Sequence, residues 1–168
     1  GFPTFAGGFE IAQTDTGMVP GVVMNFHTQS SSSCTHTGTY DFQVLHPLGG
    51  GQYRVLGDTG NKTDPCDGKL HSYLVNIPVQ RGDVLGVYVV NTWQGELSII
   101  FGSQNSNNIS EPTAGDTVTL PNQGTGTVDE SATLLAAPFA QIVSPGDNQA
   151  FSLNQSVQTT FQCGEGIG

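Results

Sequence analysis

The chain has 168 residues, a length that suits one domain or one domain with an added terminal element. Charged residues make up only 11% of it, and fourteen acidic side chains against four basic ones give a net charge of −10. Four scattered bases cannot build the basic stripe that displaces counterions from phosphates, which argues against nucleic acids as partners and disfavours anionic membrane surfaces.

Short alternating or apolar runs separated by polar turns predict strands along the whole chain. In the run 21–27, Val22, Met24 and Phe26 are expected on one face of a strand. The run 84–90 is apolar on both faces, as a central strand should be, and the glycines 49–51 predict a hairpin turn. The predicted strands are 9–12, 21–27, 40–45, 52–56, 73–77, 84–90, 97–101, 117–120, 133–137, 141–143 and 157–161.

No window holds a sustained apolar period of 3.6 residues, so almost no helix is expected. About ten short strands predict an all-β fold, an antiparallel β-sandwich of the jelly-roll or immunoglobulin-like type. Residues 1–137 are assigned to the sandwich, with an extended N-terminal segment 1–8. Residues 138–168 are predicted to be a C-terminal strand segment, either an exchanged strand or the start of a further immunoglobulin-like domain.

Three cysteines lack the close spacing that zinc sites require. Cys34 and Cys66 both lie in polar loops, where a reduced structural cysteine is rarely found, and a disulfide between them is expected. Cys163 is then left over, which predicts an intermolecular bond or a partner elsewhere.

Asn-x-Ser/Thr sequons at Asn61, Asn108 and Asn154 lie in turn-rich segments and fit a glycoprotein. Sequons and disulfide chemistry together predict a secreted, extracellular protein. No apolar stretch approaches the ~20 residues of a membrane-spanning helix, so no membrane span is expected.

Two binding sites are considered on the predicted sandwich. Asp58, Asp64 and Asp67 lie in one loop rich in hard oxygen ligands, which suits calcium, although the loop lacks the order of an EF-hand. Trp93 and Tyr53 are candidates for stacking on sugar rings. Calcium is therefore the one cofactor considered, and glycans are candidate ligands.

No catalytic residue is predicted, because no Gly-x-Ser-x-Gly elbow frames a serine and no pair of acids is brought together by spacing. The protein is expected not to be an enzyme. The tripeptide Arg81-Gly82-Asp83 is the integrin motif, but it runs directly into a strand. A tight turn, with Gly82 at a positive φ and Asp83 capping the turn, is favoured over integrin binding.

The segment Ile77-Pro78-Val79-Gln80-Arg81-Gly82-Asp83-Val84-Leu85-Gly86 resembles a hairpin found in secreted β-sandwich modules of bacterial and invertebrate extracellular proteins. The preceding Gly51-Gln52-Tyr53-Arg54-Val55-Leu56-Gly57 is similar to a strand common in those modules. The likeness covers roughly residues 21–102. It implies the fold and secretion, and no catalytic or binding residue.

These observations favour a non-enzymatic structural or adhesive extracellular glycoprotein that assembles with copies of itself into a matrix or filament, by strand exchange or by disulfide. Few charges, many small polar residues and strand-like ends with an odd cysteine motivate it. The alternative is a lectin-like carbohydrate-binding sandwich that uses calcium.

Overall fold

The computed structural model describes residues 8–13, 18–30, 32, 38–91, 104–107, 109–123, 130–137, 139–144 and 160–164. Every regular element in these ranges is a β-strand, which confirms the predicted all-β class. A helix long and apolar enough to cross a membrane is not found in the part of the chain described. The strands are β1 (Phe9–Gln13), β2 (Gly21–Gln29), β3 (Thr39–Gly49), β4 (Gln52–Asp58), β5 (Lys62–Thr63), β6 (Leu70–Val79), β7 (Val84–Asn91), β8 (Gln104–Asn107), β9 (Thr117–Thr119), β10 (Asn122–Gln123), β11 (Glu130–Ala136), β12 (Phe139–Ser144) and β13 (Thr160–Gly164).

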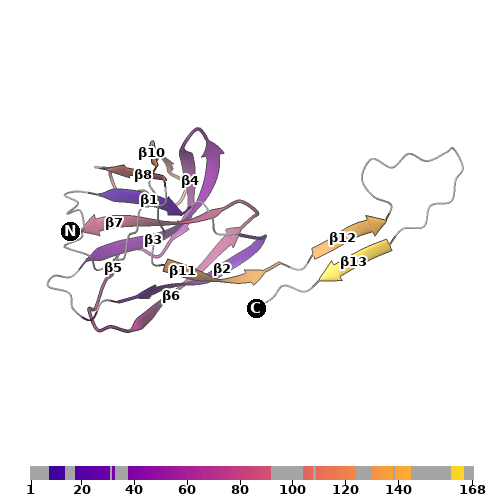
Figure 1. Ribbon diagram of the computed structural model, residues 1–168, viewed down its shortest axis with the longest axis horizontal. Coiled ribbons are helices and arrows are strands. Elements are labelled where there is room, and N and C mark those ends of the chain that lie inside the picture. Colours follow the sequence, from indigo (N-terminus) through magenta and orange to yellow (C-terminus); the bar gives the residue numbers. More distant parts are fainter. Residues whose placement is uncertain are drawn as a thin grey trace, which may run out of the picture.

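The strands form a β-sandwich of two antiparallel sheets (Figure 1). The larger sheet has the order β10-β8-β1-β7-β3-β4-β9, and β5 pairs with β3 beside this path. The smaller sheet has the order β11-β2-β6. β12 and β13 pair with each other in a separate two-stranded ladder, which extends from the end of the sandwich where β11 ends (Figure 1).

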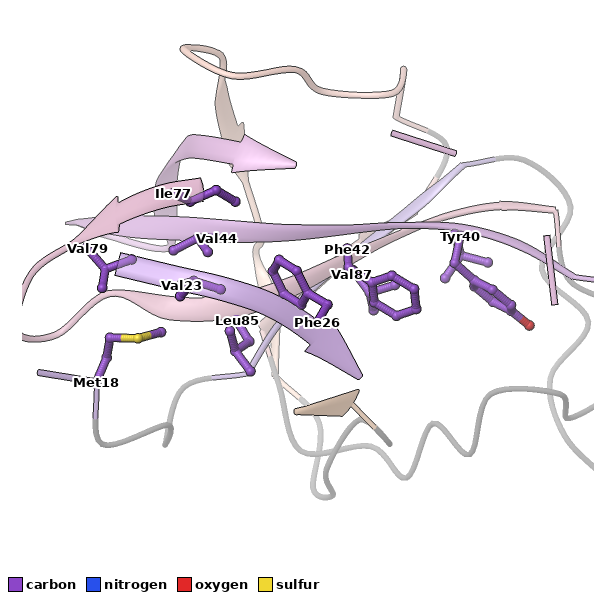
Figure 2. Packing of buried hydrophobic residues seen from close by; sticks show 11 residues of the cluster. Met18, Val23, Phe26, Tyr40, Phe42, Val44, Ile77, Val79, Leu85 and Val87 are labelled. Atoms are coloured by element: carbon purple, nitrogen blue, oxygen red, sulfur yellow. The ribbon is translucent and has the colours of Figure 1, made fainter. Parts of the chain in front are cut away.

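Apolar side chains fill the space between the two sheets (Figure 2). Phe42 of β3 is at the centre, where its ring stacks on Phe26 of β2 at 5.9 Å and on Tyr73 of β6 at 5.6 Å between centroids. Alternation along β3 places Tyr40, Phe42 and Val44 in this core, as their spacing predicts.

A second apolar cluster covers the opposite face of the larger sheet. Its members include Leu45, Tyr53, Val55, Val118 and Leu120. Residues Val84–Val89 of β7 are therefore buried on both faces of the strand, and β7 lies between β1 and β3. The prediction that the run 84–90 is a central strand is confirmed.

Glycines set the turn between β3 and β4, as the sequence predicts. The backbone φ angles of Gly49, Gly50 and Gly51 are 88°, 61° and 77°, values that residues other than glycine rarely adopt. The two strands pair antiparallel on either side of this turn. The hairpin prediction for 49–51 is thus confirmed.

Several local expectations were wrong in detail. The registers of β2 with β6 and with β11 both shift between Val23 and Asn25, so Val23 and Phe26 are the buried residues instead of Val22, Met24 and Phe26. β5, β8 and β10 are short polar strands without an apolar signal, and none was predicted. The predicted strand 97–101 and the segment 1–7 lie outside the described residues, as does the whole of 145–159.

The segment from β6 to β7 is not a hairpin, although the resembled modules led us to expect one. β6 pairs with β2 in the smaller sheet, whereas β7 pairs with β1 and β3 in the larger sheet. The turn at residues 80–83 therefore carries the chain from one sheet to the other across the end of the core.

Candidate functional site

The Arg81-Gly82-Asp83 tripeptide forms that turn between the sheets. Gly82 has a φ of 90°, and the Asp83 amide donates to the Gln80 carbonyl at 3.2 Å. The buried Asp83 carboxylate accepts from the Gln80 amide at 2.8 Å and lies 2.7 Å from His46 Nδ1. Because this carboxylate is buried and hydrogen-bonded, it is not displayed as integrin recognition of the motif would need. The predicted turn is confirmed.

The three aspartates considered for calcium each hold a local turn instead of facing one another. Asp58 accepts from the Gly60 amide at 3.1 Å, and Asp64 accepts from the Cys66 amide at 2.8 Å. Asp67 lies 2.8 Å from His71 Nε2, and this hydrogen bond lowers the pKa of the exposed carboxyl. Among the described residues, no three acidic, histidine or cysteine side chains gather as a metal site. The loop is thus organised by its own amides.

Ser30 joins the end of β2 to this loop. Its buried hydroxyl donates to Asp64 Oδ1 and accepts from the Asp67 amide at 3.1 Å, while its amide donates to the Lys69 carbonyl at 2.9 Å. A Cβ placed on Gly68 would lie 2.9 Å from Ser32 Cβ. Ser30 and Ser32 therefore lie directly against the loop that contains Cys66.

Cys66 has a φ of 55°, the only positive value found at a residue other than glycine in the described part. Cys34 lies outside the described residues, so the Cys34–Cys66 bond stays a prediction. Cys163 lies in β13, in register with Ala140 of β12. The predicted glycosylation site Asn61 is exposed between β4 and β5, whereas Asn108 and Asn154 lie outside the described residues.

The aromatic residues considered for sugar stacking do not form a binding platform in the described part. Tyr53 is 5% exposed within the second cluster, and burial raises the pKa of its hydroxyl. Tyr53 is buried, and not exposed for stacking, because the second apolar cluster covers the far face of the larger sheet, which could not be predicted from the sequence. Trp93 lies outside the described residues. An open groove of about 540 Å³ beside Glu111 and Asp116 has no aromatic ring among its described lining residues.

Sequence reasoning missed a buried polar group on β3. Asp41 and Gln43 alternate with the core residues, a pattern that suits a solvent-facing side, yet both are buried beneath the segment around Pro112. Gln43 Nε2 donates to Asp41 at 2.8 Å and to the Pro112 carbonyl at 2.9 Å. Burial raises the pKa of Asp41, and the Asp58 and Glu111 carboxylates raise it further. Polarity alone could not have revealed that this face is covered.

Glu130, the first residue of β11, was also unexpected as a buried acid. It lies on the same side of β11 as Ala132 and Leu134, which pack against the main core. Part of the residue is exposed, but both carboxylate oxygens are buried without a hydrogen-bond partner. Burial raises the pKa of this carboxyl well above its usual range.

The ends of the sheets differ in how they are protected against pairing with another chain. In the larger sheet the end strands β9 and β10 have three and two residues, and such short edges offer little to pair with. In the smaller sheet the end strands β6 and β11 have ten and seven residues. The smaller sheet therefore has the long edges.

No family model matches the chain, and no curated protein or solved structure is significantly similar to it. The proposals below rest on its own residues and contacts.

Proposed function

We propose that this chain is a non-enzymatic, extracellular structural or adhesive subunit that assembles with copies of itself. The observation that carries the proposal is the β12–β13 ladder. Among the described strands these two pair only with each other. A two-stranded ladder without further packing is marginally stable in water, and three or more strands are needed for independent stability. Further strands must therefore come from another chain or from another part of the protein.

The composition of the ladder suits pairing between chains. Neither β12 nor β13 contains Asp, Glu, Lys or Arg, although the whole chain has a net charge of −10. In register, Ala140 lies opposite Cys163 and Ile142 opposite Phe161, so alternate pairs are apolar or contain the thiol. Addition of such a ladder to a sheet edge forms main-chain hydrogen bonds and buries apolar surface. Subunits joined head to tail in this way form open filaments when the contact does not close.

The extracellular location is part of the proposal. Ser30 contacts the loop at 64–69, and Ser32 lies beside Gly68. The residues just before Cys34 are therefore close to the loop that contains Cys66, as the proposed bond requires. A bond there would hold the left-handed backbone of Cys66. An exposed Asn61 is compatible with a glycan. The lectin alternative has less support, because Tyr53 is buried and no described residue supplies an exposed aromatic platform beside the acidic groove.

The test is the mass of the full chain in solution by light scattering over a range of concentrations under oxidising conditions. We expect oligomers that grow with concentration. Ile142→Asp, which adds a charge to β12, should leave a folded monomer, whereas the matched variant Leu48→Asp on the exposed side of β3 should assemble like the unaltered chain. If light scattering shows the unaltered chain to be a monomer at high concentration, the proposal is wrong.

A further inference from the structure

We propose that β6, the long end strand of the smaller sheet, receives the β12–β13 ladder of a second copy of this chain. The inference rests on the proposed self-assembly and specifies which surface takes part in it. The completed sheet would have the order β11-β2-β6 followed by the two strands of the neighbouring molecule.

The first half of β6, residues 70–74, lacks the bulge and proline that interrupt its second half. The whole strand is ten residues long, with no Asp, Glu, Lys or Arg. Short strands, charged side chains, bulges and prolines usually prevent pairing at an edge. In β6 the bulge between Leu74 and Ile77 and the one proline, Pro78, both lie in the second half, where Ile77 is close to Gly57 of β4. The first half of the strand is therefore the open part.

The same half of β6 exposes large apolar side chains. Leu74 is 80% exposed and Leu70 is 64% exposed, more than Leu135 of β11 at 48%. Exposed apolar groups on a strand edge are costly in water and indicate a surface that another chain covers. β11 also carries Glu130, so β6 is the better match for a ladder without charges.

The ladder cannot reach the open edge of β6 in its own molecule. Only residues 137 and 138 separate β11 from β12, and the Ala137 amide still donates to the Pro20 carbonyl at 2.8 Å, beside β2. Three Cα–Cα steps span at most ~11 Å. A strand beyond β6 would lie three strand spacings from β11, about 14 Å. Pairing with β6 must therefore join two molecules.

Charge supports a second copy as the occupant. Two copies of a chain with a net charge of −10 repel each other in general, and this repulsion is weakest where neither surface carries a charge. β6 on one side and β12–β13 on the other contain no Asp, Glu, Lys or Arg, and at the start of β6 the Asp67 carboxylate lies 3.8 Å from Lys69 Nζ.

Three matched substitutions in the full chain test the inference: Leu74→Glu on β6, Leu135→Glu on β11 and Leu48→Glu on β3. All three replace an exposed leucine by the same charge, so each should remain folded, which circular dichroism checks. We expect Leu74→Glu to weaken self-association at least tenfold by light scattering, because a carboxylate would have to be desolvated against the added strand. Leu135→Glu and Leu48→Glu should associate like the unaltered chain.

The outcomes separate this inference from the proposed function. Unchanged association of Leu74→Glu shows that β6 is not the receiving edge, even though the chain assembles. Equal loss in Leu74→Glu and Leu135→Glu shows docking across the outer face of the smaller sheet, which also overturns pairing at the edge. A monomeric unaltered chain overturns the proposed function itself.

Discussion

β7 in the interior of the sandwich and the strands of the β12–β13 ladder differ in what surrounds them. β7 has a hydrogen-bonded neighbour on each edge and an apolar cluster on each face. Among the described strands, β12 and β13 each have one neighbour, which is the other strand of the ladder. Ordering a residue costs about 1–2 kcal/mol of conformational entropy, which burial offsets in β7. The sandwich is thus stabilised from within, whereas order in the ladder depends on what pairs with it.

A truncation in each region should have different effects. Phe42→Ala removes the ring that stacks on Phe26 and Tyr73, and should lower the free energy of unfolding by about 3–5 kcal/mol. Phe161→Ala in β13 should leave the unfolding midpoint of the sandwich unchanged and reduce self-association. Urea denaturation of the dilute full chain measures the first effect and light scattering the second. A large loss of sandwich stability in Phe161→Ala would contradict the separation.

The proposed Cys34–Cys66 bond would add a covalent constraint to the sandwich and none to the ladder. A bond that closes a loop of this length stabilises by about 3–4 kcal/mol. We expect the double variant Cys34→Ser/Cys66→Ser to lose that amount in urea denaturation, while Cys163→Ser leaves the dilute chain unaffected. Non-reducing peptide mapping that finds free thiols at both positions would refute the pairing.

The turn between β6 and β7 connects the two sheets, and Asp83 holds it. Asp83→Ala removes the acceptor of the Gln80 amide and the partner of His46, which should cost about 1–3 kcal/mol in thermal or urea unfolding. Arg81→Ala, at an exposed position of the same turn, should change little. Equal effects of the two variants would show that the carboxylate does not stabilise the turn.

The smallest effect is expected at Glu130, at the start of β11. Burial raises the pKa of this carboxyl in the folded chain, so the folded state binds more protons than the unfolded state above the ordinary value near 4.5. The free energy of unfolding contributed by this group is therefore highest at low pH and falls as pH rises through the folded pKa. Glu130→Gln should flatten that decline as pH rises above 4.5, and Ser131→Ala, at an exposed position of the same strand, should not. Identical pH profiles would contradict the buried position of the carboxylate.

Local patterns predicted the elements that depend on local chemistry. Alternation in β3 identified Phe42 as a core residue, and the glycines at 49–51 and at Gly82 marked turns that need positive φ angles. The apolar run in β7 identified a strand buried on both faces. Each of these conclusions requires only the nearest few residues.

Features that depend on distant parts of the chain were missed. Asp41 and Gln43 are polar, so their burial could not be predicted without knowing that the segment around Pro112 covers them. Tyr53 was taken for an exposed ring for the same reason. The turn at 80–83 has the local chemistry of a hairpin, but sheet pairing, which local sequence does not specify, sends β6 and β7 to different sheets. Of the candidate assembly surface, the C-terminal strand segment was predicted, and the open edge of β6 was not.

Hydrogen exchange at two concentrations of the full chain tests most directly whether the ladder is completed by another molecule. Backbone amides in β12 and β13 should exchange freely when the chain is dilute and become protected at high concentration, together with amides in the first half of β6. Amides of β3 and β7 should be protected at both concentrations, because their hydrogen bonds and cores are internal. Protection of β12 and β13 in the dilute chain, or exchange of both strands at every concentration, would contradict assembly through this ladder.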